Sequence, residues 1–150
     1  DHVEIFDDHI FMDTGSPHYV LFVDDLPDVP VYETGRKIRY DPSITREGTN
    51  VNFVSLEKEG DLSIRTYERG VEDETLACGT GAVASAISAH IRFHADKISY
   101  MVQTLGGRLK VDFEAAGKNR FRNIWLTGAA EYVFEGTTDI DFLSIRSDAG

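Results

Sequence analysis

A chain of 150 residues, of which 41% are hydrophobic and 27% charged, has the size and composition of one globular domain. Its formal net charge of −11 argues against nucleic acid and anionic lipid as partners, because both would repel it. One cysteine cannot form an internal disulfide, and no stretch reaches the ~20 mostly apolar residues of a membrane span. We therefore expect a cytoplasmic protein with no membrane partner.

The first half of the chain predicts strands and one short helix. Residues 1–9 are mostly polar and predict no element. Residues 19–23 form a continuous apolar run that indicates a strand, and residues 31–40 indicate a short helix. Apolar segments at 51–56 and 62–67, separated by a Glu-Gly-Asp turn, predict a β-hairpin.

The centre of the chain predicts a buried helix at 80–91. The run from Thr75 to Ile91 carries no formal charge when its histidine is neutral, and small side chains fill every side of the helix. A helix that is apolar all round lies inside a fold. Cys78 comes just before it, where free N–H groups and the helix dipole favour anions and activated thiols. Because the Gly-Thr-Gly that follows weakens a helix start, it indicates a close approach to the backbone and favours a functional thiol over a buried apolar one.

The second half predicts a series of strands. Alternating apolar residues indicate strands at 98–102 and 109–113, separated by a tight Gly-Gly turn. Two more strands are predicted at 121–126 and 129–134, joined by a Thr-Gly pair. Many hairpin-linked strands around one apolar helix make an α+β domain. We expect a strongly curved, barrel-like β-sheet wrapped around the central helix.

Three other interpretations of the central region have less support. Residues 79–84 fit the G-x-G-x-x-G/A dinucleotide pattern, but an acidic segment precedes them instead of a hydrophobic strand. His90 and His94 have zinc-ligand spacing, but no third ligand is near them in sequence. No histidine is tied by sequence to Cys78, as a cysteine hydrolase would require. We therefore expect neither a metal nor an organic cofactor.

Three motifs, in order along the chain, resemble those of diaminopimelate epimerases. They are Asp-Thr-Gly-Ser-Pro-His-Tyr-Val at 13–20, Gly-Thr-Asn-Val-Asn-Phe at 48–53, and a cysteine motif. The cysteine motif comprises Glu-Arg-Gly at 68–70, Glu-Thr at 74–75 and Ala-Cys-Gly-Thr-Gly at 77–81. Three ordered motifs are more specific than any one of them.

The resemblance covers the C-terminal half of such an epimerase, from about residue 10 to about residue 136. It implies a mixed sheet rolled around a central helix, with residues 1–136 forming one lobe of a two-lobe enzyme. The segment 137–150 is expected to pack on the other lobe, or to pair with a neighbouring molecule. The sequence does not begin with Met, so we expect it to be part of a longer protein.

The resemblance implies an epimerase that interconverts LL- and meso-diaminopimelate without pyridoxal phosphate, for lysine and peptidoglycan precursor synthesis. Such an enzyme needs a base on one face of the α-carbon and an acid on the other. Cys78 would be one of two catalytic cysteines, and the N-terminal lobe would carry the other. The N–H groups of Gly79 and Thr80 would bind the reacting carboxylate.

Other residues are assigned to the substrate by the same resemblance. Glu68, Arg69 and Asn50 would contact the distal end of diaminopimelate. His18 is given a substrate or thiol-tuning role. Ser16 stands where the family usually has Asn, so its contact with substrate has a shorter reach. The segment 71–73 is one residue longer than the familiar form of the motif.

Two alternatives remain open at this point. One is a related isomerase, such as a proline or hydroxyproline racemase. The other is a non-catalytic binding or assembly domain with the same fold. We expect the chain alone to be inactive, because it has one thiol and half of the pocket wall. Its exposed inner face is expected to favour association with another copy.

Overall fold

The computed structural model describes residues 3–93 and 96–137. The elements in chain order are β1 (Val3–Ile5), β2 (His9–Asp13), β3 (Pro17–Phe22), α1 (Val31–Arg39), β4 (Asn50–Leu56), the 3-10 turn η1 (Lys58–Gly60), β5 (Leu62–Glu68), β6 (Asp73–Thr75), α2 (Gly79–Arg92), β7 (Ser99–Thr104), β8 (Gly107–Ala115) and β9 (Phe121–Gly128).

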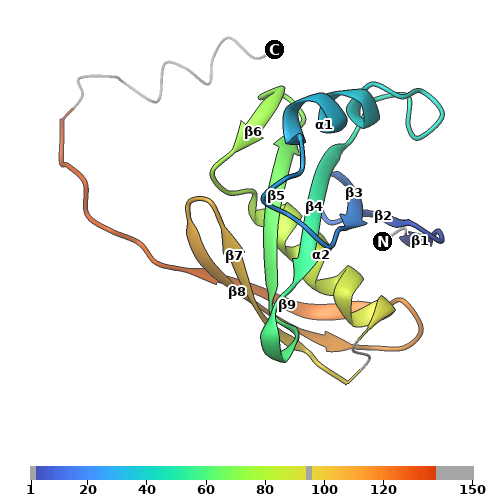
Figure 1. The fold of residues 1–150 in the computed structure, drawn as a ribbon. Helices are drawn as coiled ribbons and strands as arrows, with labels where there is room; N and C mark the ends of the chain where they lie inside the picture. Colours follow the sequence, from blue (N-terminus) through green and yellow to red (C-terminus); the bar gives the residue numbers. More distant parts are fainter. Residues whose placement is uncertain (1–2, 94–95, 138–150) are drawn as a thin grey trace, which may run out of the picture.

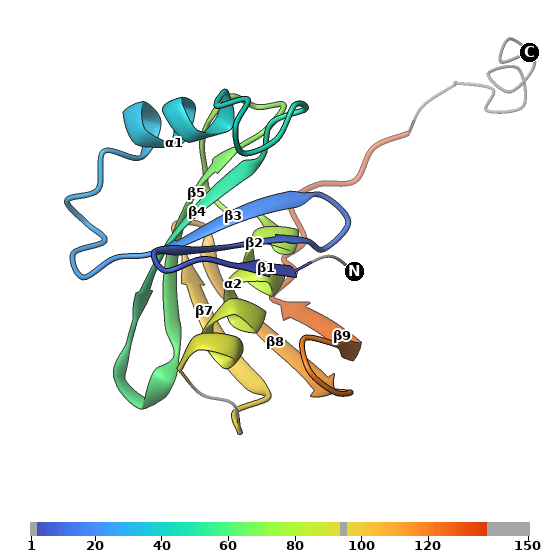
Figure 2. The same cartoon turned by 90° about the vertical axis from the view of Figure 1, so that its right-hand side faces the viewer.

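One mixed sheet curls around α2, as the sequence predicts. Its strand order is β1-β2-β3-β4-β5-β7-β8-β9, with β6 paired to β5. The pairs β3–β4 and β5–β7 are parallel, and the others are antiparallel. Parallel neighbours need a crossover connection, and the two crossovers contain α1 and α2. Figures 1 and 2 show α2 inside the curl and α1 outside it, against β4 and β5.

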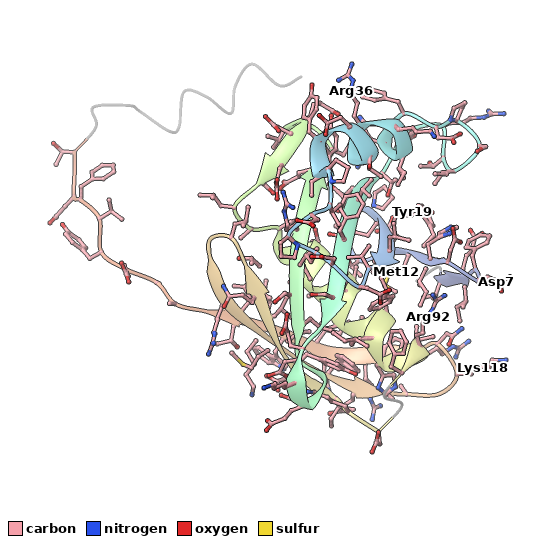
Figure 3. The ribbon with its side chains drawn as sticks, in the orientation of Figure 1. Asp7, Met12, Tyr19, Arg36, Arg92 and Lys118 are labelled. Atoms are coloured by element: carbon pink, nitrogen blue, oxygen red, sulfur yellow. The ribbon has the colours of Figure 1, made fainter. Side chains whose placement is uncertain are left out.

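The core is built around the small side chains of α2. Every residue from Gly81 to His90 is buried, so strands pack on all sides of the helix. The apolar strand residues that surround it include Ile10, Met12, Val20, Val54, Leu62, Ile64, Tyr100, Val102, Val111 and Phe113. At the C-terminal end of α2, Arg92 donates to backbone oxygens of Phe6, Asp7 and His9, and Figure 3 shows Arg92 on the side of the β1–β2 turn. A cation there also complements the helix dipole.

Helix α1 covers the outer face of β4 and β5 through a second apolar cluster. This cluster contains Val31 of the helix together with Val51, Phe53 and Tyr67 of the strands. Gly35 allows the close approach, since a Cβ there would lie 2.4 Å from the Cβ of Tyr67. The position of α1 on the sheet is therefore set by a residue without a side chain.

Most predicted elements are confirmed, but the sequence interpretation was wrong at both ends. Residues 1–9 were given no element, yet β1 and most of the turn to β2 fall there, where Arg92 binds the turn. The predicted strand at 129–134 is absent: β9 continues through Gly128, and residues 129–137 lead away from the sheet without strand partners (Figure 1). The expectation for 137–150 falls almost wholly on 138–150, which lie outside the described residues.

Candidate active site

Cys78 occupies the N-cap position of α2 with an extended backbone (φ −125°, ψ 110°). Its side chain makes no capping hydrogen bond, and the residue is only 6% exposed. The thiol borders a cavity of about 480 Å³. The other lining residues are Glu68, Ala77, Gly79, Thr80, Val83 and Leu126.

The first turn of α2 presents backbone donors beside this thiol. The N–H groups of Gly79, Thr80 and Gly81 precede the first intrahelical hydrogen bond, which runs from Ala82 N–H to the Cys78 carbonyl at 2.9 Å. Free N–H groups at a helix start, together with the helix dipole, favour a bound carboxylate. The cavity therefore combines a thiol with an anion-binding helix end.

His18 lies behind the first turn of α2 and is fully buried. Its Nδ1 lies 3.0 Å from Nδ2 of Asn52, and because an amide nitrogen donates, Nδ1 is the acceptor. Nε2 therefore carries the proton, and it lies 2.9 Å from Oγ1 of Thr80 and 3.0 Å from Oγ of Ser16. The Thr80 hydroxyl in turn lies 3.6 Å from Sγ of Cys78. A hydrogen-bonded path thus joins the imidazole to the thiol.

The imidazole of His18 is neutral at pH 7. Burial lowers its pKa from 6.5 to about 4. The negative charge of Asp13 acts to raise this pKa, and the positive charge of Arg69 lowers it further. A neutral imidazole donates through one nitrogen only, which fixes the direction of the hydrogen bond to Thr80 or Ser16. His18 therefore acts here as an oriented donor instead of a charged group.

Asn50 joins the three motifs to one another. Its Nδ2 donates to the Pro17 carbonyl at 2.9 Å and to Oγ of Ser16 at 3.2 Å. Its Oδ1 accepts the backbone N–H of Arg69 at 2.9 Å. The residue is 4% exposed, and both amide hydrogens are engaged within the protein. Asn50 thus holds the end of β5 against the β3–β4 pair.

The acidic member of the site lies on the rim of the same cavity. Glu68 ends β5, lines the cavity beside Cys78, and accepts a hydrogen bond from Oγ1 of Thr75 at 2.9 Å. Arg69 follows it, and its Nη1 lies 3.5 Å from the Gly48 carbonyl. All eight residues singled out from the sequence, including Ser16, therefore lie in the cavity lining or in the network behind it.

The sequence interpretation missed Asn52. It is fully buried, holds Nδ1 of His18, and accepts from Thr66 Oγ1 at 3.1 Å. The signal was present, because Val54 shares the strand face of Asn52 while Val51 and Phe53 occupy the other face, so both faces of this strand are apolar. An amide on such a face is buried and needs partners. Asn52 also explains one glycine: a Cβ on Gly81 would lie 2.4 Å from Asn52 Oδ1. A side chain of the protein therefore makes the close approach expected there.

Among the described residues, no group of three His, Cys, Asp or Glu side chains is arranged to hold a metal ion. Nδ1 of His90 lies 2.8 Å from the Lys97 carbonyl, and His94 lies outside the described residues. In the described part of the chain, no helix has the length and hydrophobicity that a membrane crossing requires.

Comparison with known proteins shows the family of the chain. The sequence model of the family "Diaminopimelate epimerase" matches residues 10–133. The diaminopimelate epimerase of Flavobacterium psychrophilum is 46% identical over 135 residues, which cover 90% of this chain and 52% of that protein. The enzyme of the same name from Aquifex aeolicus is 44% identical over 128 residues, covering 85% and 44%. The chain thus spans about half the length of the curated relatives it matches.

Solved structures of low sequence identity share the fold. A phenazine biosynthesis protein of the PhzF family from Bacillus anthracis superposes with a TM-score of 0.51 at 17% identity, covering 71% of this chain and 33% of that one. A PhzF-family protein from Enterococcus faecalis gives 0.51 at 16% identity, covering 70% and 37%. At these sequence identities, the similarity concerns the fold alone.

Proposed function

The chain belongs to the diaminopimelate epimerase family, and on that premise we propose that it forms one lobe of an enzyme that interconverts LL- and meso-diaminopimelate. The reaction needs no pyridoxal phosphate and serves lysine and peptidoglycan precursor synthesis in the cytoplasm. The observation that carries the proposal is the Cys78 thiol at the start of α2, in a cavity that Glu68 also lines.

Cys78 acts as one of two acid/base groups at the α-carbon. In one direction its thiolate takes the α-proton, so that a C–H bond breaks and an S–H bond forms. A second thiol, supplied by the other lobe, delivers a proton to the opposite face. The carbanion lies next to a carboxylate, and the free N–H groups of Gly79 and Thr80 stabilise the charge that grows there. Sulfur suits both roles, since a free thiol titrates near ~8.5.

The network behind α2 orients this chemistry. His18 donates to the Thr80 hydroxyl, which leaves the hydroxyl hydrogen free for the sulfur of Cys78 or for the substrate carboxylate. Ser16, on the same network, offers a short hydroxyl donor. This arrangement supports a thiol-tuning role for His18, because a neutral, buried imidazole keeps one direction of hydrogen bonding.

Glu68 and Arg69 bind the distal amino and carboxylate groups of diaminopimelate. The Glu68 carboxylate would bind the amino group, and the Arg69 guanidinium would bind the carboxylate. Glu68 ends β5 and lines the cavity, and Arg69 follows it. Both amide hydrogens of Asn50 are engaged, one by the Ser16 hydroxyl and one by the Pro17 carbonyl. We propose that Asn50 contacts the substrate when its amide gives up the bond to Ser16 and donates to a substrate oxygen instead.

The lobe boundaries follow from the same proposal. Residues 1–136 form this lobe, and 137–150 pack on the lobe that carries the second cysteine. Alone, the chain lacks an acid for the opposite face and is inactive, and it associates with the missing lobe or with another copy. The exposed side chains of Tyr132, Val133 and Phe134, each at least 80% exposed, support a partner for this region.

Proton NMR of LL-diaminopimelate in D2O tests the proposal, through loss of the α-proton signal. We expect loss with the two-lobe protein, no loss with its Cys78→Ser variant, and no loss with the 150-residue chain. Ser85→Ala on the same helix is the matched control, because the Ser85 hydroxyl donates to the Gly81 carbonyl at 2.7 Å and Ser85 does not line the cavity.

The remaining outcomes separate the alternatives. Loss of the α-proton of proline or hydroxyproline, but not of diaminopimelate, would assign the racemase reaction. Retention of every α-proton by the two-lobe protein would leave a binding or assembly domain. Loss with the 150-residue chain alone would refute the need for a second lobe.

A further inference from the structure

The turn at residues 69–72, between β5 and β6, has an unusual backbone. Glu72 has a φ of +62°, a left-handed conformation that is costly for a residue with a side chain. Its N–H donates to the Glu68 carbonyl at 2.8 Å and closes the turn. The turn contains Arg69 and follows Glu68, and both residues belong to the proposed substrate site. A strained residue beside a binding site indicates that its side chain has a specific task.

At least four donor groups surround the carboxylate of Glu72. Its Oε1 accepts from Nε and Nη2 of Arg39, at 3.1 and 2.9 Å, and from the N–H of Gly70 at 3.0 Å. The hydroxyl of Tyr67 lies 3.4 Å from Oε2. The side chains of Arg39 and Glu72 are 14% and 28% exposed, so solvent screens this ion pair only in part. One carboxylate therefore joins the turn to the end of α1.

Burial alone would raise the pKa of Glu72. The Gly70 N–H and the Arg39 guanidinium outweigh burial and hold that pKa below its usual value. Glu72 therefore remains an anion at neutral pH and keeps its ion pair.

Arg39 also binds the 47–50 loop, which leads into β4. Its Nη1 donates to the Glu47 carbonyl at 3.1 Å. Gly48 makes room for it, because a Cβ there would lie 1.5 Å from the same Nη1. Asn50, at the end of this loop, accepts the Arg69 N–H at 2.9 Å. Arg39 thus lies between two segments that both carry residues of the proposed substrate site.

We propose that Arg39 and Glu72 are positioning residues that fix the 69–72 turn against the 47–50 loop, and so set the affinity for the distal end of the substrate. The identity of that substrate rests on the function proposed above, whereas the positioning rests on the contacts alone.

The same hairpin offers a matched control. Glu74 forms a bidentate ion pair with Arg65, at 2.7 and 2.8 Å, and the two side chains are 21% and 22% exposed. Arg65 donates to the carbonyls of Leu26, Pro27 and Val29, ahead of α1, and not to the 47–50 loop. Loss of this pair therefore removes a similar interaction without releasing the 69–72 turn.

The first experiment uses backbone hydrogen exchange in the 150-residue chain, which needs no substrate. In Glu72→Gln we expect the Arg69 amide, bonded to Asn50, to exchange about tenfold faster, because a hydrogen bond to a charged group contributes this order of free energy. Glu74→Gln should leave that rate unchanged. Equal Arg69 protection in Glu72→Gln and in the parent chain would overturn the positioning role, whatever the substrate.

The second experiment measures kinetics of the two-lobe protein with LL-diaminopimelate. Glu72→Gln and Arg39→Lys should raise KM about tenfold with kcat within about twofold, as expected for loss of binding common to ground and transition states. Glu72→Gly should raise KM as well, because it removes the carboxylate, although glycine adopts φ +62° without strain. An unchanged KM, or an equal rise in Glu74→Gln, would overturn the proposal. A parent protein inactive on diaminopimelate would refute the proposed function, and Arg69 exchange would still decide the positioning.

Discussion

Gly81 in the first turn of α2 should not tolerate a methyl group, although alanine is the best helix former. A Cβ at this position would lie 2.4 Å from Oδ1 of Asn52, and 3.2 and 3.3 Å from Sγ and Cβ of Cys78. Asn52 is fully buried and cannot swing into solvent. Gly81→Ala must therefore displace the amide, the thiol, or the start of the helix.

The cost follows from the bonds that Asn52 makes. Its amide holds Nδ1 of His18 at 3.0 Å and accepts from Oγ1 of Thr66 at 3.1 Å. Overpacking a core costs roughly 1–3 kcal/mol, and a buried polar group left unpaired costs about 1–3 kcal/mol more. The higher helix propensity of alanine returns at most about 1 kcal/mol. We expect Gly81→Ala to lose about 1–5 kcal/mol of unfolding free energy.

Gly79 is the matched control, two residues earlier on the same turn. A Cβ there would meet only Cδ2 of Leu126, at 2.9 Å, the end of a flexible and 44% exposed side chain. Gly79→Ala should therefore change stability by less than about 1 kcal/mol. Urea unfolding of the 150-residue chain, analysed by linear extrapolation, measures both values. Equal unfolding free energies for the two variants would refute the packing of Asn52 against this turn.

Three further predictions use the same chain. Because His18 binds a proton near pH 6.5 in the unfolded state but only near pH 4 in the folded state, its contribution to stability is complete above pH 6.5, and about 3 kcal/mol is lost as the pH falls to 4. Urea titrations at several pH values should show this slope of unfolding free energy against pH. An equal slope in His18→Gln would contradict the prediction. Gly35→Ala should cost about 1–3 kcal/mol, because its Cβ would meet Tyr67 at 2.4 Å and lift α1; unchanged urea unfolding would show that α1 is not packed closely. Leu126→Ala should open the cavity and speed iodoacetamide alkylation of Cys78 several-fold; an unchanged rate would mean that Leu126 does not shield the thiol.

Much of the fold could be predicted because the pattern of the core is local. The small residues of α2 predict that this helix is buried, and the alternation in β7 and β8 predicts which of their residues face the core. The ends of the sheet were predicted less well. The segment 129–134 ends in Tyr132, Val133 and Phe134, residue types that favour strands. A strand also needs a neighbour to pair its hydrogen bonds, and residue preference does not report one. Conversely, β1 has only three residues, two of them exposed, so its Val-Glu-Ile alternation is too short to predict a strand.

In the site, the residue types were predictable and their connections were not. Cys78 and Thr80 follow from the helix start, and the motifs indicate His18 and Asn50. Nothing in the sequence shows that Asn50 spends both amide hydrogens on the protein. The left-handed backbone of Glu72 is equally hidden, since glutamate has no preference for it and its ion pair with Arg39 joins residues 33 positions apart. Such features depend on contacts between distant segments.

The place of Leu126 in the cavity wall has a consequence for synthesis of the chain. Cys78 is made long before β9, yet the side chain that packs over Gly79 comes from that last strand. On the ribosome, a nascent chain that ends before residue 126 lacks one side of the cavity wall, so its Cys78 thiol is accessible to oxidants and alkylating agents. Pulse alkylation of arrested chains of increasing length should show protection of Cys78 only once β9 has emerged and paired with β8.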